Sequence, residues 1–232
     1  MLGDFLEISL ATRDILASIE FYRKLGFSEA PVGSSWKHPY TVMTDGRLYL
    51  GLHERDAASP ALSFVLPELT RRMGSFEALG IEFAVCNIEL HHFNELGFLD
   101  PDGQMVTLLE ARTYSPVHAA HVEASLCGYF LEYRMPVRRG AESAHFWEAL
   151  GLIVTPPEEG VTPYHQASWS GINLGLQEAG PKARPTLVFT NGKLEETAAL
   201  LDMHGLEIQK DTQGLQLTTP EGLNLLLCPE EP

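Results

Sequence analysis

The chain of 232 residues has few cysteines and few basic residues, and both shortages narrow its possible functions. Its three cysteines, Cys86, Cys127 and Cys228, have neither paired nor metal-type spacing. This favours reduced thiols in a cytosolic protein over a disulfide framework. The 16 lysine and arginine residues face 31 aspartate and glutamate residues, which gives a net charge of −15. Such a charge repels a phosphate backbone, so nucleic acid is not an expected partner.

Long hydrophobic runs and familiar catalytic motifs are also missing. No apolar run approaches the roughly 20 residues that a membrane span needs, so no membrane partner is expected. The first residues lack a basic segment followed by an apolar one, which predicts a cytoplasmic location. The chain shows no Ser-His-Asp order, no nucleophile elbow and no glycine-rich phosphate loop. The sequence therefore has to be interpreted through its organisation.

An internal repeat dominates that organisation. Short segments of the first half recur in the same order in the second half. The matched segments are Phe5–Glu7 with Phe130–Glu132, Ser18–Tyr22 with Ser143–Trp147, Leu25–Phe27 with Leu150–Leu152, Leu50–Glu54 with Leu174–Glu178, and Asp100–Gly103 with Thr219–Gly222. Order kept along a whole chain indicates duplication. We expect a first module at 1–112, a linker at 113–125 and a second module at 126–232, sizes typical of domains.

Each copy has the pattern of a strand, a helix and further strands. In the first copy, a strand at Phe5–Ala11 precedes apolar residues at helical spacing, and Gly26 ends that helix. Three strand-like segments, a second helix near Glu68–Leu79 and two more strands follow. Pro101-Asp102-Gly103 is a turn signature, since proline presets φ and glycine accepts a positive φ. The pattern predicts an α+β fold of two tandem βαβββ modules.

This arrangement resembles the vicinal oxygen chelate superfamily, which includes glyoxalase I, extradiol dioxygenases and bleomycin resistance proteins. The resemblance is carried by Ser18-Ile19-Glu20-Phe21-Tyr22 with Leu25-Gly26-Phe27, and by Leu99-Asp100-Pro101-Asp102-Gly103 before an apolar strand. The resemblance extends over nearly the whole chain, once in each copy of the repeat. It implies two modules paired edge to edge into one curled-sheet cup, usually around a divalent metal ion.

The resemblance also implies four metal-ligand positions in each module. On this chain they fall on Glu7 and Glu132, Leu50 and Leu174, Pro60 and Pro185, and Thr107 and Leu226. Leucine and proline side chains cannot bind a metal, and one carboxylate is too few to hold a divalent ion. We therefore expect no cofactor at the usual place, with a divalent metal at displaced ligands as the alternative.

Strand alternation predicts which side chains line the cup. Phe5, Glu7 and Ser9 should face it, and His53, whose parity is opposite to that of Leu52, should point away. The cavity should be mainly apolar with few polar groups, as small-molecule pockets usually are. The predicted ligand-binding residues are Glu7, Glu132, Arg134, Leu50, Phe64, Thr107, Leu174, Phe189 and Asn224.

The two glutamates should behave differently. Arg134 lies two residues after Glu132, on the same face, and should keep that carboxylate ionised and occupied. Glu7 has no basic neighbour on its strand, so it is the predicted catalytic or ligand-anchoring carboxylate. On this basis Glu7→Gln should leave thermal stability unchanged or raised, whereas Glu132→Gln should lower it.

Three hypotheses follow. The first is a protein that binds a small, largely apolar molecule in the cup without the usual metal. The second is an enzyme, either a lyase, isomerase or dioxygenase with displaced metal ligands, or a metal-free one with Glu7 as general base. The third is a degenerate structural relative with a filled cup. A homodimer is left open.

Overall fold

The computed structural model describes residues 1–32, 36–89, 94–111, 125–157, 164–180 and 182–230. The predicted linker at 113–125 therefore lies outside the described residues, apart from Ser125. The strands of the first half are β1 (Asp4–Thr12), β2 (Ser28–Ala30), β3 (Tyr40–Thr44), β4 (Tyr49–Glu54), β5 (Ala61–Leu66), β6 (Phe83–Asn87), β7 (Glu95–Leu99) and β8 (Met105–Glu110). Those of the second half are β9 (Tyr129–Val137), β10 (Ile153–Thr155), β11 (Tyr164–Trp169), β12 (Ile172–Glu178), β13 (Thr186–Asn191), β14 (Gln209–Lys210), β15 (Leu215–Thr218) and β16 (Asn224–Pro229).

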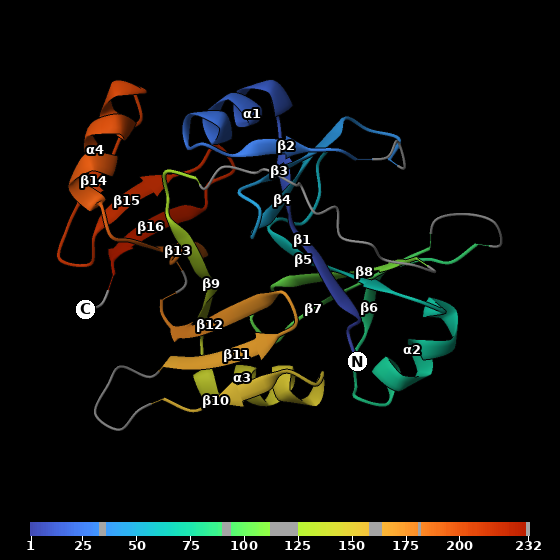
Figure 1. Cartoon of the computed structure of the whole chain (residues 1–232). Coiled ribbons are helices and arrows are strands. Elements are labelled where there is room, and N and C mark those ends of the chain that lie inside the picture. Colours follow the sequence, from blue (N-terminus) through green and yellow to red (C-terminus); the bar gives the residue numbers. More distant parts are fainter. Residues whose placement is uncertain (33–35, 90–93, 112–124, 158–163, 181, 231–232) are drawn as a thin grey trace.

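Each half folds into its own eight-stranded sheet (Figure 1). The strand order is β2-β3-β4-β1-β5-β8-β7-β6 in the first half and β10-β11-β12-β9-β13-β16-β15-β14 in the second. In both, two βαβββ units meet through an antiparallel pair of central strands, β1 with β5 and β9 with β13.

The α+β class and the duplication of the module are confirmed, and one detail differs from the prediction. The two copies do not share a single cup, because each copy already contains two βαβββ units that pair with one another. The predicted helix near Glu68–Leu79 is the crossover helix of the second such unit. A local sequence pattern shows that helix but does not show which strand the chain pairs with next.

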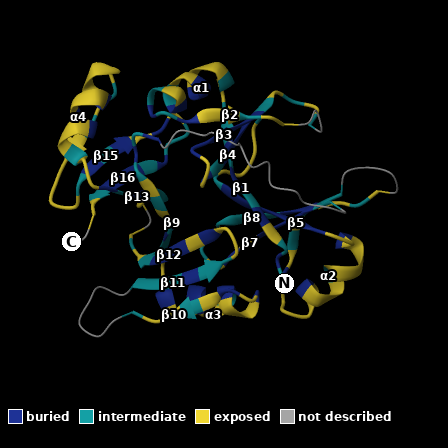
Figure 2. Cartoon of the chain, viewed as in Figure 1, coloured by how far each residue is buried: buried dark blue, intermediate teal, exposed yellow. Residues whose placement is uncertain are grey.

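Two described helices cover one face of each sheet. They are α1 (Ile15–Lys24) and α2 (Leu69–Glu77) in the first half, and α3 (Gly140–Ala149) and α4 (Leu194–Met203) in the second. Helix α1 begins where the Asp14 side chain accepts a hydrogen bond from the Ala17 amide, and it ends before Gly26, whose φ is 88°. Figure 2 shows the strands buried and the outer faces of the helices exposed. No described helix is long and apolar enough to cross a membrane.

The two halves pack together through reciprocal contacts. The hydroxyl of Tyr22 on α1 donates to Glu221 in the β15–β16 turn, at 2.9 Å. In return, the hydroxyl of Ser143 on α3 donates to Asp102 in the β7–β8 turn. Figure 1 shows the same pairing, with α1 beside the β13–β16 unit and α3 below β7. One continuous cluster of buried side chains runs through both halves, so they form one body.

Asp100, in the β7–β8 turn, is 5% exposed, and its Oδ2 is buried without a hydrogen-bond partner. Burial raises its pKa to about 6, although its Oδ1 accepts hydrogen bonds from the amides of Asp102 and Gln104. Between about pH 4 and 6 the folded state holds a proton that the unfolded state releases. Folding stability should therefore fall as the pH rises through that window, by up to about 3 kcal/mol.

Asp100→Asn should remove this loss, since the amide oxygen can still accept both backbone hydrogen bonds. We expect the variant to be about 1–3 kcal/mol more stable than the parent at pH 8 and equally stable at pH 4, measured by urea unfolding. Asp102→Asn serves as the control, because Asp102 accepts from the Arg138 amide at 2.8 Å and should not gain stability. A gain of equal size at both pH values for Asp100→Asn would contradict the account.

Candidate functional site

Glu7 lies at the centre of β1 and is 1% exposed. Its carboxylate accepts hydrogen bonds from the Tyr40 hydroxyl at 2.7 Å, the Ser9 hydroxyl at 2.8 Å and, with Glu7 ionised, His53 Nε2 at 3.1 Å. Gly51 on β4 makes room for it, since a Cβ there would collide with the carboxylate. Three donors thus compensate the buried charge, as buried carboxylates require.

His53 faces Glu7, so the prediction that it points away is wrong. The parallel ladder of β1 and β4 pairs Ser9 with Gly51 and Ala11 with His53, which puts Gly51 and His53 on the Glu7 face. We call this the first cup face: the side of the first sheet that carries Glu7, Ser9, Gly51 and His53. The leucines on either side of Gly51 face the helices instead. Side chains do alternate along β4, but it is Gly51 and His53, not the leucines, that lie on the cup side.

A chain of hydrogen bonds runs through Glu7. His38 Nε2 lies 2.9 Å from His53 Nδ1, and His53 Nε2 in turn contacts Glu7. On the other side Ser9 Oγ lies 2.7 Å from Ser63 Oγ. Because the Ser9 proton goes to Glu7, Ser63 donates to Ser9. With neutral imidazoles, His38 donates to His53 and His53 to Glu7.

These hydrogen-bonded side chains border a cavity of about 70 Å³ on the first cup face. One water molecule needs about 10–15 Å³ by the same measure, so the cavity has room for several waters or a small organic molecule. It is lined by Ser9, Ala11, Trp36, His53, Arg55, Ala57, Ala58, Ala61, Ser63, Val85, Glu95, Met105, Thr107 and Leu109. Glu7 lies behind Ser9 and His53 and is not itself among the lining residues.

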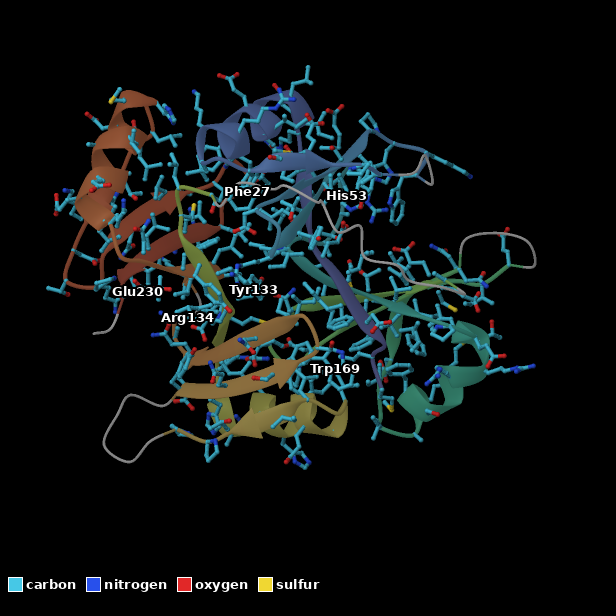
Figure 3. The ribbon with its side chains drawn as sticks, viewed as in Figure 1. Phe27, His53, Tyr133, Arg134, Trp169 and Glu230 are labelled. Carbon is cyan, nitrogen blue, oxygen red and sulfur yellow. The ribbon has the colours of Figure 1, made fainter. Side chains whose placement is uncertain are left out.

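The equivalent face of the second sheet, carrying Glu132 and Arg134, is the second cup face. Arg134 Nε donates to Glu132 Oε1 at 2.9 Å, as the sequence spacing predicts. Tyr164, the counterpart of Tyr40, donates to the other carboxylate oxygen. Burial and the Glu132 charge raise the pKa of Tyr164 well above its usual value. Gln177 stands at the position that His53 occupies in the first half. It lines a surface hollow of about 420 Å³ together with Glu132, Arg134 and Tyr164. Figure 3 shows His53 and Arg134 in different halves, well apart.

Four of the predicted ligand-binding residues lie in the core. Leu50, Phe64, Leu174 and Phe189 pack against the helices and are fully buried. Both central strand pairs shift register at a bulge, so Phe5 meets Phe64 on the helix side while Glu7 meets Ser63 on the cup side. The prediction that Phe5 and these four residues line a cup is therefore wrong. The bulge reverses the parity of Phe5, whereas the other four lie on the helix-facing side of their own strands.

The remaining predicted positions are divided between three places. Thr107 lines the first cavity, and Glu132 and Arg134 line the hollow of the second half. Asn224 lies at the start of β16 and lines a different hollow with Gln216 and Thr218. The structure thus brings together Glu7 and Thr107 from the prediction and adds His53, Tyr40 and Ser63.

The donor set around Glu7 does not fit a divalent metal. The cup-side residues of β1, β4, β5 and β8 near it are Ser9, His53, Ser63 and Thr107, which offer one imidazole beside the carboxylate. That imidazole is hydrogen-bonded to Glu7 itself. Within the described ranges, no group of three or more His, Cys, Asp or Glu side chains could hold a metal ion. A stable site for a divalent ion needs more ligands than these.

Comparison with solved structures identifies the fold. A catechol 2,3-dioxygenase superposes with a TM-score of 0.66 at 12% identity, covering 99% of this chain and 88% of that one. The 2,3-dioxygenase LapB from Pseudomonas sp. KL28 gives 0.66 at 15% identity, covering 100% and 94%. The Mn(II)-bound glyoxalase from Novosphingobium aromaticivorans gives 0.61 at 12% identity, covering 99% and 82%. The chain has the vicinal oxygen chelate fold.

This likeness concerns the fold alone, because the sequence identities are low. No protein-family model matches the sequence, and no curated protein matches it. The vicinal oxygen chelate fold explains the pairing of two βαβββ units in each half. The chemistry of this chain has to be argued from its own cup-face residues.

From the sequence, Glu7→Gln was expected to leave thermal stability unchanged or raised. The hydrogen bonds around Glu7 predict the opposite, a loss of stability. The glutamine side chain has one acceptor oxygen, and its NH₂ group would face one of the three donors. We expect a loss of about 1–3 kcal/mol in unfolding free energy, hence a Tm lower by a few degrees, measured by thermal denaturation. His53→Gln is the matched control, because Gln177 stands at that position in the second half and can still donate to the carboxylate. It should cost less than Glu7→Gln, and the reverse order would refute the hydrogen-bond assignment.

Proposed function

We propose that the protein binds a small, largely apolar molecule in the first-half cavity, without a divalent metal at the superfamily's usual positions. The observation that carries this proposal is a difference between the two cup faces. Ser63 and Thr107, neighbours on β5 and β8, correspond to Val188 and Leu226 on β13 and β16. The smaller side chains line a cavity beside β5 and β8 in the first half. The hollow of the second half lies over β9, β11 and β12 instead, and Val188 and Leu226 do not line it.

The lining of the cavity suits such a ligand. Val85, Met105 and Leu109 supply apolar surface, and a few polar groups converge on it, a combination typical of small-molecule sites. Since Ser63 donates to Ser9, its oxygen can accept a hydrogen bond from a ligand. The names of the structural neighbours refer to small oxygen-bearing aromatics such as catechol, which is compatible with a cavity of this kind.

The proposal predicts that filling the cavity prevents binding. Thr107→Leu introduces the residue that the second half has at this position. A fragment library should yield binders by ligand-observed NMR, and Thr107→Leu should weaken them at least about tenfold, which is about 1.4 kcal/mol. Thr186→Leu adds the same volume on the second cup face and should leave binding unchanged. Equal binding by the Thr107→Leu protein would place the ligand elsewhere.

The metal-free part of the proposal has its own test. Protein purified without chelator should contain well under one equivalent of Mn, Fe, Ni or Zn by elemental analysis, because Glu7 and His53 are too few ligands. Treatment with a chelator should leave Tm and fragment binding unchanged. A stoichiometric ion lost from the His53→Gln variant would refute this part.

The hydrogen-bond chain favours a second candidate function, metal-free proton transfer with Glu7 as general base. A proton from a bound ligand would pass to Ser63, each serine would hand its own proton onward, and Glu7 would receive the last one. With both imidazoles in the opposite tautomer, His53 Nε2 would take the proton from Glu7, the His53 Nδ1 proton would pass to His38 Nε2, and His38 would release its own proton to solvent. The test is exchange of the α-protons of hydroxyacetone in D₂O, which should exceed the buffer rate and fall in Ser9→Ala. No exchange above buffer would leave binding as the function.

A further inference from the structure

Arg55 lies at the solvent side of the first-half cavity, just after β4. It lines the cavity together with the exposed Ala57 and Ala58. Its guanidinium lies 5.2 Å from the centre of the Trp36 ring, close enough for a cation–π contact. Its Nε is buried and has no hydrogen-bond partner, and it forms no ion pair with any described residue.

An unpaired N–H of a charged, half-buried group is costly, and the cost is larger than for a neutral donor. Neither of the two nearby carboxylates accepts a hydrogen bond from Arg55. Glu7 is already occupied by three donors, and Glu95 on β7, which lines the same cavity, accepts from Asn87 at 3.3 Å. His38 also faces Arg55, and burial, followed by the Arg55 charge, lowers the His38 pKa. Within the described part of the chain, the rim therefore offers a cation that lacks an acceptor.

We propose that the ligand of this cavity is a small organic carboxylate whose charged group binds Arg55. This inference rests on the proposed binding function and names its ligand class. A guanidinium presents adjacent N–H donors in one plane, a geometry that matches the two oxygens of a carboxylate. The contact with Trp36 holds the guanidinium at the rim. The apolar part of the ligand then lies against Met105, Leu109 and Val85, deeper in the cavity.

The test compares acids with amides of the same shape: propanoate with propanamide, and benzoate with benzamide. Each is titrated into the full chain and followed by ligand-observed NMR. At least one acid should bind about tenfold more tightly than its amide. Arg55→Gln should abolish that preference by weakening the acid about tenfold, to roughly the affinity of its amide. Arg55→Lys, which keeps the charge but loses Nε–H, should retain part of it.

Glu95→Gln is the matched control of opposite sign. Removing a negative charge from the same cavity should tighten the acid about two- to fivefold and leave the amide unchanged. Thermal denaturation of each variant establishes that it is folded; a misfolded Arg55→Gln leaves Arg55→Lys and Glu95→Gln to decide the question.

The outcomes separate this inference from the function on which it rests. Equal binding of acid and amide, with both lost in Thr107→Leu, would overturn the carboxylate assignment and keep the binding function. An acid preference that survives Arg55→Gln would also overturn it. Binding of acid and amide that Thr107→Leu leaves unchanged would overturn both proposals, as would the absence of binding by every fragment and probe.

Discussion

A buried glutamate packed against a glycine of the neighbouring parallel strand is the constraint on which both sheets depend. Glu7 lies over Gly51 and Glu132 over Gly175, and any side chain at either glycine would occupy the space of the carboxylate. The parallel registers of β1 with β4 and of β9 with β12 bring each pair together. A tyrosine from the next strand, Tyr40 or Tyr164, hydrogen-bonds the carboxylate in each half. Since burying a carboxylate without partners costs several kcal/mol, the strands on that side of each sheet have to keep this register.

The two halves then differ in what balances the charge and what fills the space. In the second half Arg134 binds Glu132 directly, whereas in the first half Ser9 stands at that position and His53 reaches Glu7 from β4. One copy of the repeat therefore pairs its carboxylate with a guanidinium, and the other hydrogen-bonds its carboxylate to an imidazole.

Much of the fold could be predicted from the sequence, because duplication and the helix-ending Gly26 are local and leave clear patterns. The face of each strand was harder to predict. Strand alternation shows which side chains share a face, but not which face lines the cup. Assigning the leucines of β4 to the cup therefore placed Leu50 inside it and His53 outside it. The bulges after Phe5 and before Phe189 reversed parity, and no local residue pattern marks them. Gly51 and Gly175 were the available signal, since a glycine in mid-strand indicates close approach of another group. The presence of two βαβββ units in each half was missed, because β1 pairs with β5, a strand far from it in the sequence.

The larger side chains on the β13–β16 side of the second cup face have a consequence for mutational tolerance. Val188 and Leu226 keep apolar contacts that Ser63 and Thr107 give up, and the two halves share one continuous core. Tyr22 with Glu221 and Ser143 with Asp102 tie the open half to the filled one from both sides. Because one core spans both halves, apolar contacts in the second half also stabilise the first. Side chains around the cavity can thus change with less danger to folding than in an isolated half, so new ligand specificities can arise there by single substitutions.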